Sequence, residues 1–267
     1  MRVLGGKFRI DCFWLGTIPL VSVLLTICLR TPYLLSIFLF YGAPAIYISF
    51  RFLHLRQILK GVIFVVIVTI PFSIVVDYIG ISSGVWYVPA TLFSNRFLGV
   101  IPWEDFVWMF VATYSIFAIY VACVGNGTPK LINRRMGHFM LFAILGLSCF
   151  FLVLALGGRV VFVWPTRYAY FCVGLLFFLM PAAVLWRRSL KMLLRFFPFI
   201  LYFLYLTVAF EMSVSVLALW IFPGTYLFPP LILFGQNPIP YEELFFVGIV
   251  GPLAAAGFYQ YFEGESS

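Results

Sequence analysis

Long apolar runs, separated by short polar segments, recur along the whole chain. They cover about 13–29, 33–50, 59–80, 102–124, 137–156, 166–186, 197–219 and 240–262. A helix needs about 20 mainly apolar residues to cross a bilayer, so each run predicts one transmembrane helix. Gly42 and Pro44 interrupt the second run, which makes seven helices the next best count. The pattern predicts an all-α, polytopic membrane bundle of about eight helices.

Composition agrees with a membrane-embedded chain. The 267 residues are 64% hydrophobic and 10% charged, and the mean hydropathy is +1.10. Soluble domains are about 45–50% apolar and about 25% charged. Lipid must therefore cover much of the surface, and the bilayer is the first expected partner. The basic stretch before the first run has no clear cleavage site after it, which favours an uncleaved helix over a signal peptide.

The distribution of Lys and Arg predicts the orientation of these helices. With eight helices and the N-terminus inside, 13 basic residues fall in inner segments and only Arg30, Arg96, Arg159 and Arg167 in outer loops. This is a strong positive-inside bias, and it supports an even helix count. Both termini are predicted to be cytoplasmic, in an integral protein of the cell membrane. The net charge of +8 reflects these inner loops, and no nucleic-acid partner is expected.

A duplicated pattern of acidic and aromatic residues divides the chain into two halves. The predicted units are a membrane repeat at 1–124, a cytoplasmic linker at 125–136 and a second membrane repeat at 137–267. The first half contains Asp77, Trp86-Tyr87-Val88-Pro89 and Pro102-Trp103-Glu104-Asp105. The second contains Glu211, Trp220-Ile221-Phe222-Pro223 and Pro240-Tyr241-Glu242-Glu243. In both halves the first acid precedes the Trp by nine residues, which predicts a parallel repeat of two four-helix units.

Six of the nine acidic residues belong to this repeat. The other three, Asp11, Glu263 and Glu265, are expected to be solvated. Acids at membrane depth are costly and are functional candidates by default. A simpler interpretation also exists, since Pro-x-Glu is an ordinary helix start and Asp77 or Glu211 could cap a helix end. Recurrence of the whole pattern on the same side of the membrane favours function.

The chemistry expected of these residues is proton transfer next to a cation. Glu104 and Asp105 point about 100° apart on a helix, so one can face a cavity while the other supports it. Carboxyls that crowd together in a weakly hydrated site favour protonation of at least one of them, which makes a proton donor. Aromatic faces stabilise a desolvated cation, and the motif regions supply them. The predicted binding residues are Trp86, Trp103, Trp108, Trp220 and Tyr241.

Several other classes of protein are disfavoured by missing motifs. No GxGxxG or GxxxxGK[ST] segment occurs, so no nucleotide cofactor is indicated. The five cysteines form no CxxC pair, and two histidines without partners at ligand spacing predict no metal site. No Asp-rich diphosphate motif occurs, and the four lysines lie in inner segments, which disfavours a prenyltransferase and a retinal protein. No cofactor is predicted.

The duplicated motifs resemble those of the small membrane lycopene cyclase domains of some bacteria, archaea and fungi. Those proteins consist of two similar membrane units, each with a Pro-x-Glu-[Glu/Asp] motif, an upstream acid and Gly-x-Trp. Asp77 with Gly84-Val85-Trp86 matches the upstream part. Glu211 with Ala218-Leu219-Trp220 departs from it by Glu for Asp and Ala for Gly, so the two halves could differ in role.

The resemblance implies a redox-neutral cyclisation of the ends of lycopene to β-ionone rings through a carbocation. It implies that Glu104 and Glu242 are the central acid–base residues, with Asp105 and Glu243 next and Asp77 and Glu211 as tuning or relay groups. A carotenoid-end hydratase using the same protonation, or a proton-coupled transporter, is the alternative. The sequence leaves open the number of rings formed, the ring isomer, one cavity or two, and any homo-oligomer or association with other carotenoid enzymes.

Overall fold

The computed structural model describes residues 8–123, 131–132, 134–164, 168–186, 190–232 and 237–263, with side chains for all of these except 8–10 and 190–195. Most of the predicted linker 125–136 lies outside the described residues, as does Glu265. So do six of the basic residues that were used to predict orientation, namely Arg2, Lys7, Lys130, Arg167, Arg187 and Arg188. The bounds of the three predicted units therefore remain a prediction.

Eight helical spans in the described residues are long and apolar enough to cross a membrane. They are Asp11–Leu29, Tyr33–Phe52, Leu55–Ser82, Trp103–Cys123, Arg134–Gly157, Ala169–Trp186, Phe196–Val216 and Tyr241–Glu263. This confirms the predicted all-α polytopic bundle, and the chain is a membrane protein. The interrupted second run is one of the spans, so eight is the correct count for the described part of the chain.

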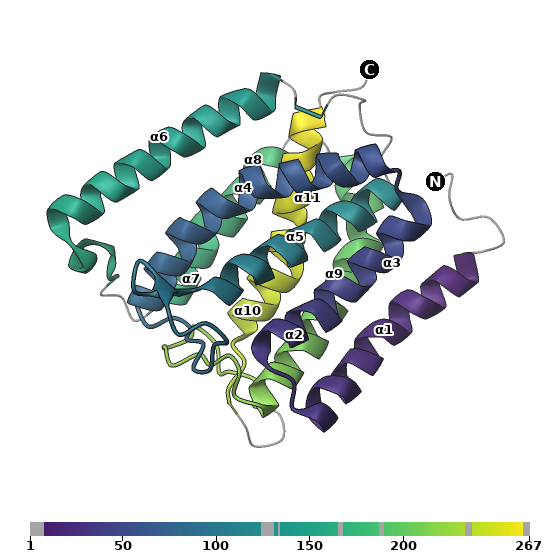
Figure 1. Ribbon diagram of the computed structural model, residues 1–267, viewed down its shortest axis with the longest axis horizontal. Coiled ribbons are helices and arrows are strands. Elements are labelled where there is room, and N and C mark those ends of the chain that lie inside the picture. The colour runs from purple at the N-terminus through teal and green to yellow at the C-terminus, as the bar shows by residue number, and fades with distance from the viewer. Residues whose placement is uncertain are drawn as a thin grey trace.

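The first four spans form the first half of the bundle (Figure 1). Their elements are α1 (Phe8–Leu29), α2 (Tyr33–Ile37), η1 (Phe38–Gly42), α3 (Ala43–Phe52), α4 (Leu55–Ser82), β1 (Arg96–Phe97), β2 (Ile101–Pro102) and α5 (Trp103–Cys123). α2, η1 and α3 together make the second span. β1 and β2 pair as a short antiparallel hairpin that leads directly into α5.

The last four spans form the second half. Their elements are α6 (Arg134–Gly157), η2 (Arg159–Phe162), α7 (Ala169–Gly174), η3 (Leu175–Leu179), α8 (Met180–Trp186), α9 (Leu190–Val216), α10 (Tyr241–Phe245), η4 (Phe246–Val250) and α11 (Gly251–Glu263). The Leu231–Ile239 bridge stands where the first half has its hairpin. α6 lies at the edge of the bundle with large apolar side chains exposed, as expected of a helix that faces lipid (Figure 1).

Wide π turns interrupt three of the spans, and each has a proline at the same place. The prolines are Pro44, Pro181 and Pro252, and each comes six residues after the first residue of its π turn. Proline lacks a backbone N–H and its ring crowds the carbonyl four residues earlier, so a wider turn relieves the clash. The turns η1 and η3 occupy equivalent spans of the two halves. In both spans α-helix continues on each side of the π turn.

The ends of α4 and α9 have the same backbone conformation. Gly84 and Ala218, at equivalent positions, both have positive φ angles of 67° and 52°. The amides of the next residues, Val85 and Leu219, each donate to a carbonyl five residues earlier, at 2.9 Å. This is the usual way in which a left-handed residue ends a helix. The repeat therefore extends to the backbone, including the position where Ala replaces Gly.

The two Trp-x-x-Pro segments meet each other at one end of the bundle, called here the motif end. Tyr87 and Ile221, each the residue after the motif Trp, form an antiparallel bridge with N···O distances of 2.8 and 2.9 Å. The rings of Trp86 and Trp220 stack with centroids 6.4 Å apart and an interplanar angle of 27°. Equivalent residues thus pair with each other, which is the contact expected across a pseudo-twofold axis.

Two acids at the opposite end of the bundle are paired with basic residues, and Asp11 is also buried, contrary to the prediction that both are solvated. Asp11 is 4% exposed, accepts a hydrogen bond from the Tyr47 hydroxyl at 2.7 Å and lies 3.4 Å from Arg51 Nε. Lys60 and Glu263 form an ion pair between α4 and α11. The prediction was wrong because helix neighbours far apart in sequence supply a compensating partner for each acid.

Candidate active site

All six acids of the repeat are buried at the motif end. Their exposed fractions are 3% for Asp77, 0% for Glu104, 0% for Asp105, 2% for Glu211, 4% for Glu242 and 2% for Glu243. None of them forms a salt bridge with a residue in the described part of the chain. Burial without a counter-ion is costly for a carboxylate, in contrast to the paired acids at the opposite end. This cluster is therefore the candidate active site.

Glu104 and Glu242 hold the loops that precede their helices. Glu104 Oε1 accepts the amides of Leu92 and Phe93 at 2.5 and 3.3 Å, and Glu242 Oε1 accepts the amide of Leu227 at 2.5 Å. In both residues Oε2 is buried and has no hydrogen-bond partner. Each glutamate thus ties a loop to the start of a helix with one oxygen and keeps the other free.

In the second half, two glutamates and a tyrosine lie together. The Tyr170 hydroxyl donates a hydrogen bond to Glu243 Oε2. The carboxyls of Glu211 and Glu243 are near enough to interact electrostatically. Two buried carboxyls that are both ionised repel each other, so this arrangement favours a proton on one of them.

In the first half, the two aspartates have different neighbours. The Ser73 hydroxyl donates a hydrogen bond to Asp77 Oδ2. Both carboxyl oxygens of Asp105 are buried without a hydrogen-bond partner, and the Tyr33 hydroxyl lies close by without reaching hydrogen-bond geometry. The Arg96 guanidinium attracts the Asp105 carboxylate electrostatically. A hydroxyl donor for Asp77 and a nearby guanidinium for Asp105 thus distinguish the surroundings of these two acids.

A cavity lies between the two halves and receives acids from both. Asp77 from α4 and Glu243 from α10 are the carboxylates in its lining. The remaining lining residues are Val76, Trp86, Trp108, Met109, Tyr170, Val173, Gly174, Phe178, Trp220, Phe246 and Val247. The other four acids of the repeat, Asp105, Glu211, Glu104 and Glu242, are not among its lining residues. The arrangement places two carboxyl groups in one space of otherwise apolar and aromatic character.

Three of the five predicted aromatic binding residues line this cavity. Trp86, Trp108 and Trp220 are 6%, 6% and 4% exposed, and the rings of Trp108 and Trp220 lie 5.6 Å apart. Their indole nitrogens are buried without hydrogen-bond partners. Trp103 and Tyr241 are 43% and 47% exposed and lie outside the lining. Both of these follow the motif proline, where the helix start directs the side chain outward.

The sequence reasoning missed Tyr33 and Tyr170, which occupy equivalent places in the two halves. They are 1% and 5% exposed. Each ring lies against the motif tryptophan of the opposite half, with centroids 5.6 and 5.8 Å apart. A signal was present, because each tyrosine precedes the proline of its π turn, Pro44 or Pro181, by 11 residues. That spacing was not part of the recognised motifs.

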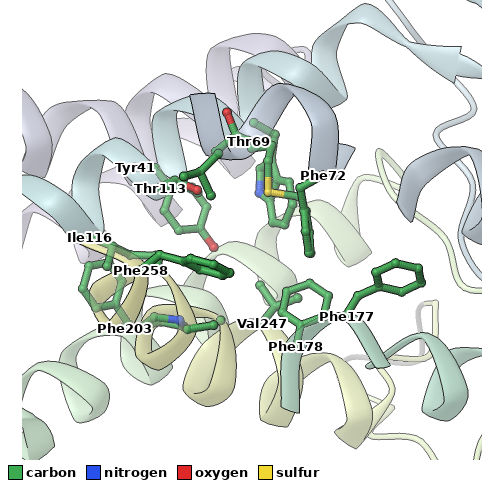
Figure 2. A pocket seen from close by; sticks show the side chains of 18 of the residues that line it. Tyr41, Thr69, Phe72, Thr113, Ile116, Phe177, Phe178, Phe203, Val247 and Phe258 are labelled. Atoms are coloured by element: carbon green, nitrogen blue, oxygen red, sulfur yellow. The ribbon is translucent and has the colours of Figure 1, made fainter. Parts of the chain in front are cut away.

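A second, larger space adjoins the first (Figure 2). The two spaces share Trp108, Met109, Phe178 and Val247 in their linings. The larger one has no carboxylate in its lining, and its walls come from η1, α4, α5, η3, α9, η4 and α11. Phe72, Phe177 and Phe178 stand together on one side of it in Figure 2. An apolar chamber therefore leads to the carboxyl groups from the interior of the bundle.

Tyr226 supports the loop that Glu242 holds. Its hydroxyl donates a hydrogen bond to the carbonyl of Phe222. Burial raises the pKa of Tyr226 to about 12, and the nearby Glu242 carboxylate adds to the rise. The phenol therefore stays protonated and keeps its hydrogen bond at any physiological pH. The described residues contain no group of three or more His, Cys, Asp or Glu side chains that could hold a metal ion.

One comparison with known proteins bears on the first half of the chain. Residues 30–123 match the lycopene cyclase family. The matching segment runs from α2 through α5 and includes Asp77, Trp86, Glu104 and Asp105. This lycopene cyclase match confirms the resemblance predicted from the motifs, and it supports carotenoid cyclisation as the general activity. No curated protein and no solved structure matches the chain.

Proposed function

We propose that the chain cyclises the linear ends of lycopene to β-ionone rings within the cell membrane. The observation that carries this proposal is the cavity between the halves, where Asp77 and Glu243 face three tryptophans. Carboxyls supply a proton and remove one, while indole faces stabilise the positive charge formed between these steps. An aromatic face contributes about 2 kcal/mol or more to a desolvated cation.

The chemistry needs proton transfer alone. A carboxylic acid protonates the terminal double bond and leaves a tertiary cation. That cation closes onto the next double bond, which forms the ring C–C bond and moves the charge to a ring carbon. A carboxylate then takes a proton from the adjacent carbon and restores a double bond. One proton enters and one leaves, so product and substrate have the same formula and no electrons are exchanged.

Exclusion of water is the second requirement, since water would capture the cation as a tertiary alcohol. The carboxyls that face the cavity are 3% and 2% exposed, and the tryptophans around them are 4–6% exposed. The adjoining apolar chamber suits a polyene, which has no polar group to satisfy. The end of the carotenoid would reach the carboxyls while its chain occupies the chamber.

The six acids divide by position into three pairs of proposed roles. Asp77 and Glu243 act on the substrate, because they line the cavity. Asp105 and Glu211 are not among the lining residues and relay protons. Glu104 and Glu242 were ranked first from the sequence, and their amide hydrogen bonds favour holding the motif loops instead. Their Oε2 atoms have no hydrogen-bond partner, so variants of these two glutamates test whether they also act as acid–base residues.

The orientation is also part of the proposal. The charge bias predicts that both termini lie in the cytoplasm and that the motif end lies at the outer leaflet. α1 begins and α11 ends on the same side of the bundle, opposite the motif loops, as an even number of spans requires (Figure 1). Substrate would enter from the bilayer, where an apolar carotenoid dissolves.

Expression of the chain in a lycopene-accumulating bacterial host tests the function. Monocyclic or bicyclic carotenes in the pigment extract are the expected products. Hydroxylated acyclic carotenoids would identify a hydratase instead. Unchanged lycopene, with the protein present in the membrane, would refute both enzyme proposals and favour a transporter.

The same host separates the roles of the glutamates. Glu104→Gln and Glu242→Gln keep a carbonyl oxygen that can accept the loop amide, so conversion is expected to stay within about threefold of wild type. Glu243→Gln is expected to lose conversion by at least about 100-fold, the usual size of a general-acid contribution. If Glu104→Gln and Glu242→Gln are inactive while Glu243→Gln is active, Glu104 and Glu242 are the acid–base residues, as the sequence predicted, and the role proposed for Glu243 is wrong.

A further inference from the structure

The apolar chamber lies across the pseudo-twofold axis that relates the two halves. Equivalent positions line it from both sides: Tyr41 and Phe178 each lie three residues before the proline of a π turn, and Met109 and Val247 each lie five residues after a motif glutamate. A space that straddles such an axis borders two equivalent seams, where a π turn of one half meets the acid-bearing helix of the other. One seam lies between η1 and α9 and the other between α4 and η3, and aromatic rings meet across both.

Helix α1 closes the seam between η1 and α9. The Ser22 hydroxyl of α1 donates a hydrogen bond to the Leu39 carbonyl of η1 at 2.8 Å. The Tyr205 hydroxyl of α9 donates one to the Gly16 carbonyl of α1 at 2.9 Å. One helix is thus bonded to both sides of this seam, and it runs along the outer edge of the bundle there (Figure 1).

Helix α6, the first span of the second half, is the counterpart of α1 and packs differently. Phe150 of α6 lies against Tyr78 of α4 and Phe162 of η2, with ring centroids 5.5 and 4.6 Å apart. Near its other end, Phe139 lies 5.6 Å from Phe258 of α11. These ring contacts join α6 to α4, η2 and α11, whereas α1 is bonded to the two sides of a seam.

Burial differs between the two seams at three pairs of equivalent positions. Beside α1, all three members are 0–3% exposed, namely Phe40, Tyr41 and Leu206. Their counterparts at the α4–η3 seam are partly exposed, namely Phe177, Phe178 and Phe72. Among these described residues, the chamber is therefore closed at the first seam and reaches the surface at the second.

We propose that the carotenoid enters sideways from the bilayer through the α4–η3 seam, and that Phe72, Phe177 and Phe178 bind the part of the polyene that remains outside the chamber. This inference rests on the proposed cyclisation. The three rings line the chamber and stand together on one side of it (Figure 2). Phe72 meets Phe177 and Phe178 edge-on, with centroids 6.2 and 5.3 Å apart. Such a surface suits a chain without polar groups, and the closed seam opposite means that one end of the polyene enters at a time.

Reversible cross-links across each seam test the entry route. In a full-length chain whose five native cysteines are replaced, Phe72→Cys with Phe177→Cys joins α4 to η3, and Gly16→Cys with Tyr205→Cys joins α1 to α9. A short bis-thiosulfonate reagent links each pair, and a reducing agent releases it. Lycopene conversion in proteoliposomes is expected to fall at least about tenfold when α4 and η3 are linked, and to recover on reduction. Linking α1 to α9 is expected to change conversion by less than about twofold.

A pair of single substitutions tests the binding role without cross-links. Phe72→Ala removes a ring from the open seam and is expected to raise the lycopene concentration for half-maximal rate at least about threefold, with the maximal rate within about twofold of wild type. The reason is that substrate and transition state share this contact with the polyene. Leu206→Ala, at the equivalent position of the closed seam, is expected to leave both kinetic constants unchanged and to lower the unfolding temperature.

Several outcomes would overturn the entry route. Full conversion by the chain linked between α4 and η3 is one, and an equal loss in the chain linked between α1 and α9 is another. Equal kinetic effects of Phe72→Ala and Leu206→Ala, at wild-type protein levels, would contradict the route as well. A wild-type chain that leaves lycopene unchanged would instead refute the proposed cyclisation itself, so the two failures are distinguishable.

Discussion

The surroundings of each carboxyl, rather than its residue type, distinguish the acids of this protein. Glu242 and Glu243 are neighbours in sequence, yet one accepts a loop amide and the other meets a tyrosine and a second carboxyl. Consecutive positions on a helix point in different directions, so a Glu-Glu pair serves two purposes at once. The same separation holds for Glu104 and Asp105. In a motif of two adjacent acids, one side chain therefore holds the preceding loop, and the other is available for chemistry.

A residue-scale prediction concerns the left-handed ends of α4 and α9. Ala218→Gly is expected to stabilise the protein by about 1 kcal/mol, because a left-handed φ costs an alanine roughly 1–2 kcal/mol more than a glycine. Gly84→Ala is the matched change of opposite sign, since its Cβ would meet no atom within 4 Å and only the φ of 67° penalises it. Thermal unfolding of the purified protein in detergent measures both. Unfolding temperatures that shift in the same direction in both variants would contradict this explanation of the helix ends.

At the scale of elements, proline positions and charge pairs arrange the helices around the cavity. A π turn inserts an extra residue into a helix, which rotates the residues beyond it relative to those before it. η3 carries Phe177 and Phe178 into the wall of the apolar chamber, and η4 places Val247 on the same wall. The prolines thus contribute to the shape of the chamber as well as to the course of the helices.

An element-scale prediction concerns the contact between α4 and α11. Glu263→Gln removes a counter-charge from Lys60, which is 4% exposed, and is expected to destabilise the protein on the order of 3 kcal/mol. The double variant Lys60→Met, Glu263→Leu replaces the pair by apolar side chains and is expected to stay within about 1 kcal/mol of wild type. Denaturation in mixed micelles measures both. A double variant as unstable as the single one would show that the charges themselves are needed.

For the whole molecule, the meeting of the two halves creates the site. Trp86 and Trp220 stack on each other, and the tyrosine of each half lies on the tryptophan of the other. The cavity takes one carboxyl from each half, so neither half contains a complete site. This explains in physical terms why both copies keep their acids and aromatic residues, whatever the differences between them.

A whole-molecule prediction uses the apolar chamber. Ala112 lines it, so Ala112→Phe is expected to fill part of the space and lower lycopene conversion at least about tenfold with little loss of stability. Ala118 lies on the same helix, is 0% exposed and is outside the lining. Ala118→Phe should therefore overpack the core and cost about 1–3 kcal/mol. Pigment per unit of membrane protein, together with unfolding temperature, distinguishes the two. Full conversion by Ala112→Phe would exclude the chamber as the polyene site.

Much of the fold and part of the site could be predicted from local patterns. Apolar run length predicted the eight spans, since a helix that crosses a bilayer has a minimum length set by its thickness. The pairing of Asp11 and Glu263 could not be predicted, because their partners Arg51 and Lys60 come from other helices. The same limit applies to Trp103 and Tyr241, whose outward direction depends on how each helix is rotated in the bundle.

The sequence by itself determined the membrane class, the duplication and the six acids, because hydropathy and repeated spacing are local properties of a chain. Only the tertiary structure decided which acids face the cavity, that one cavity joins both halves, and that Glu211 and Glu243 lie near each other. Those properties depend on helix rotation and on distances between residues more than 130 positions apart, such as Asp77 and Glu243. Packing of helices sets these distances, and no short motif encodes them.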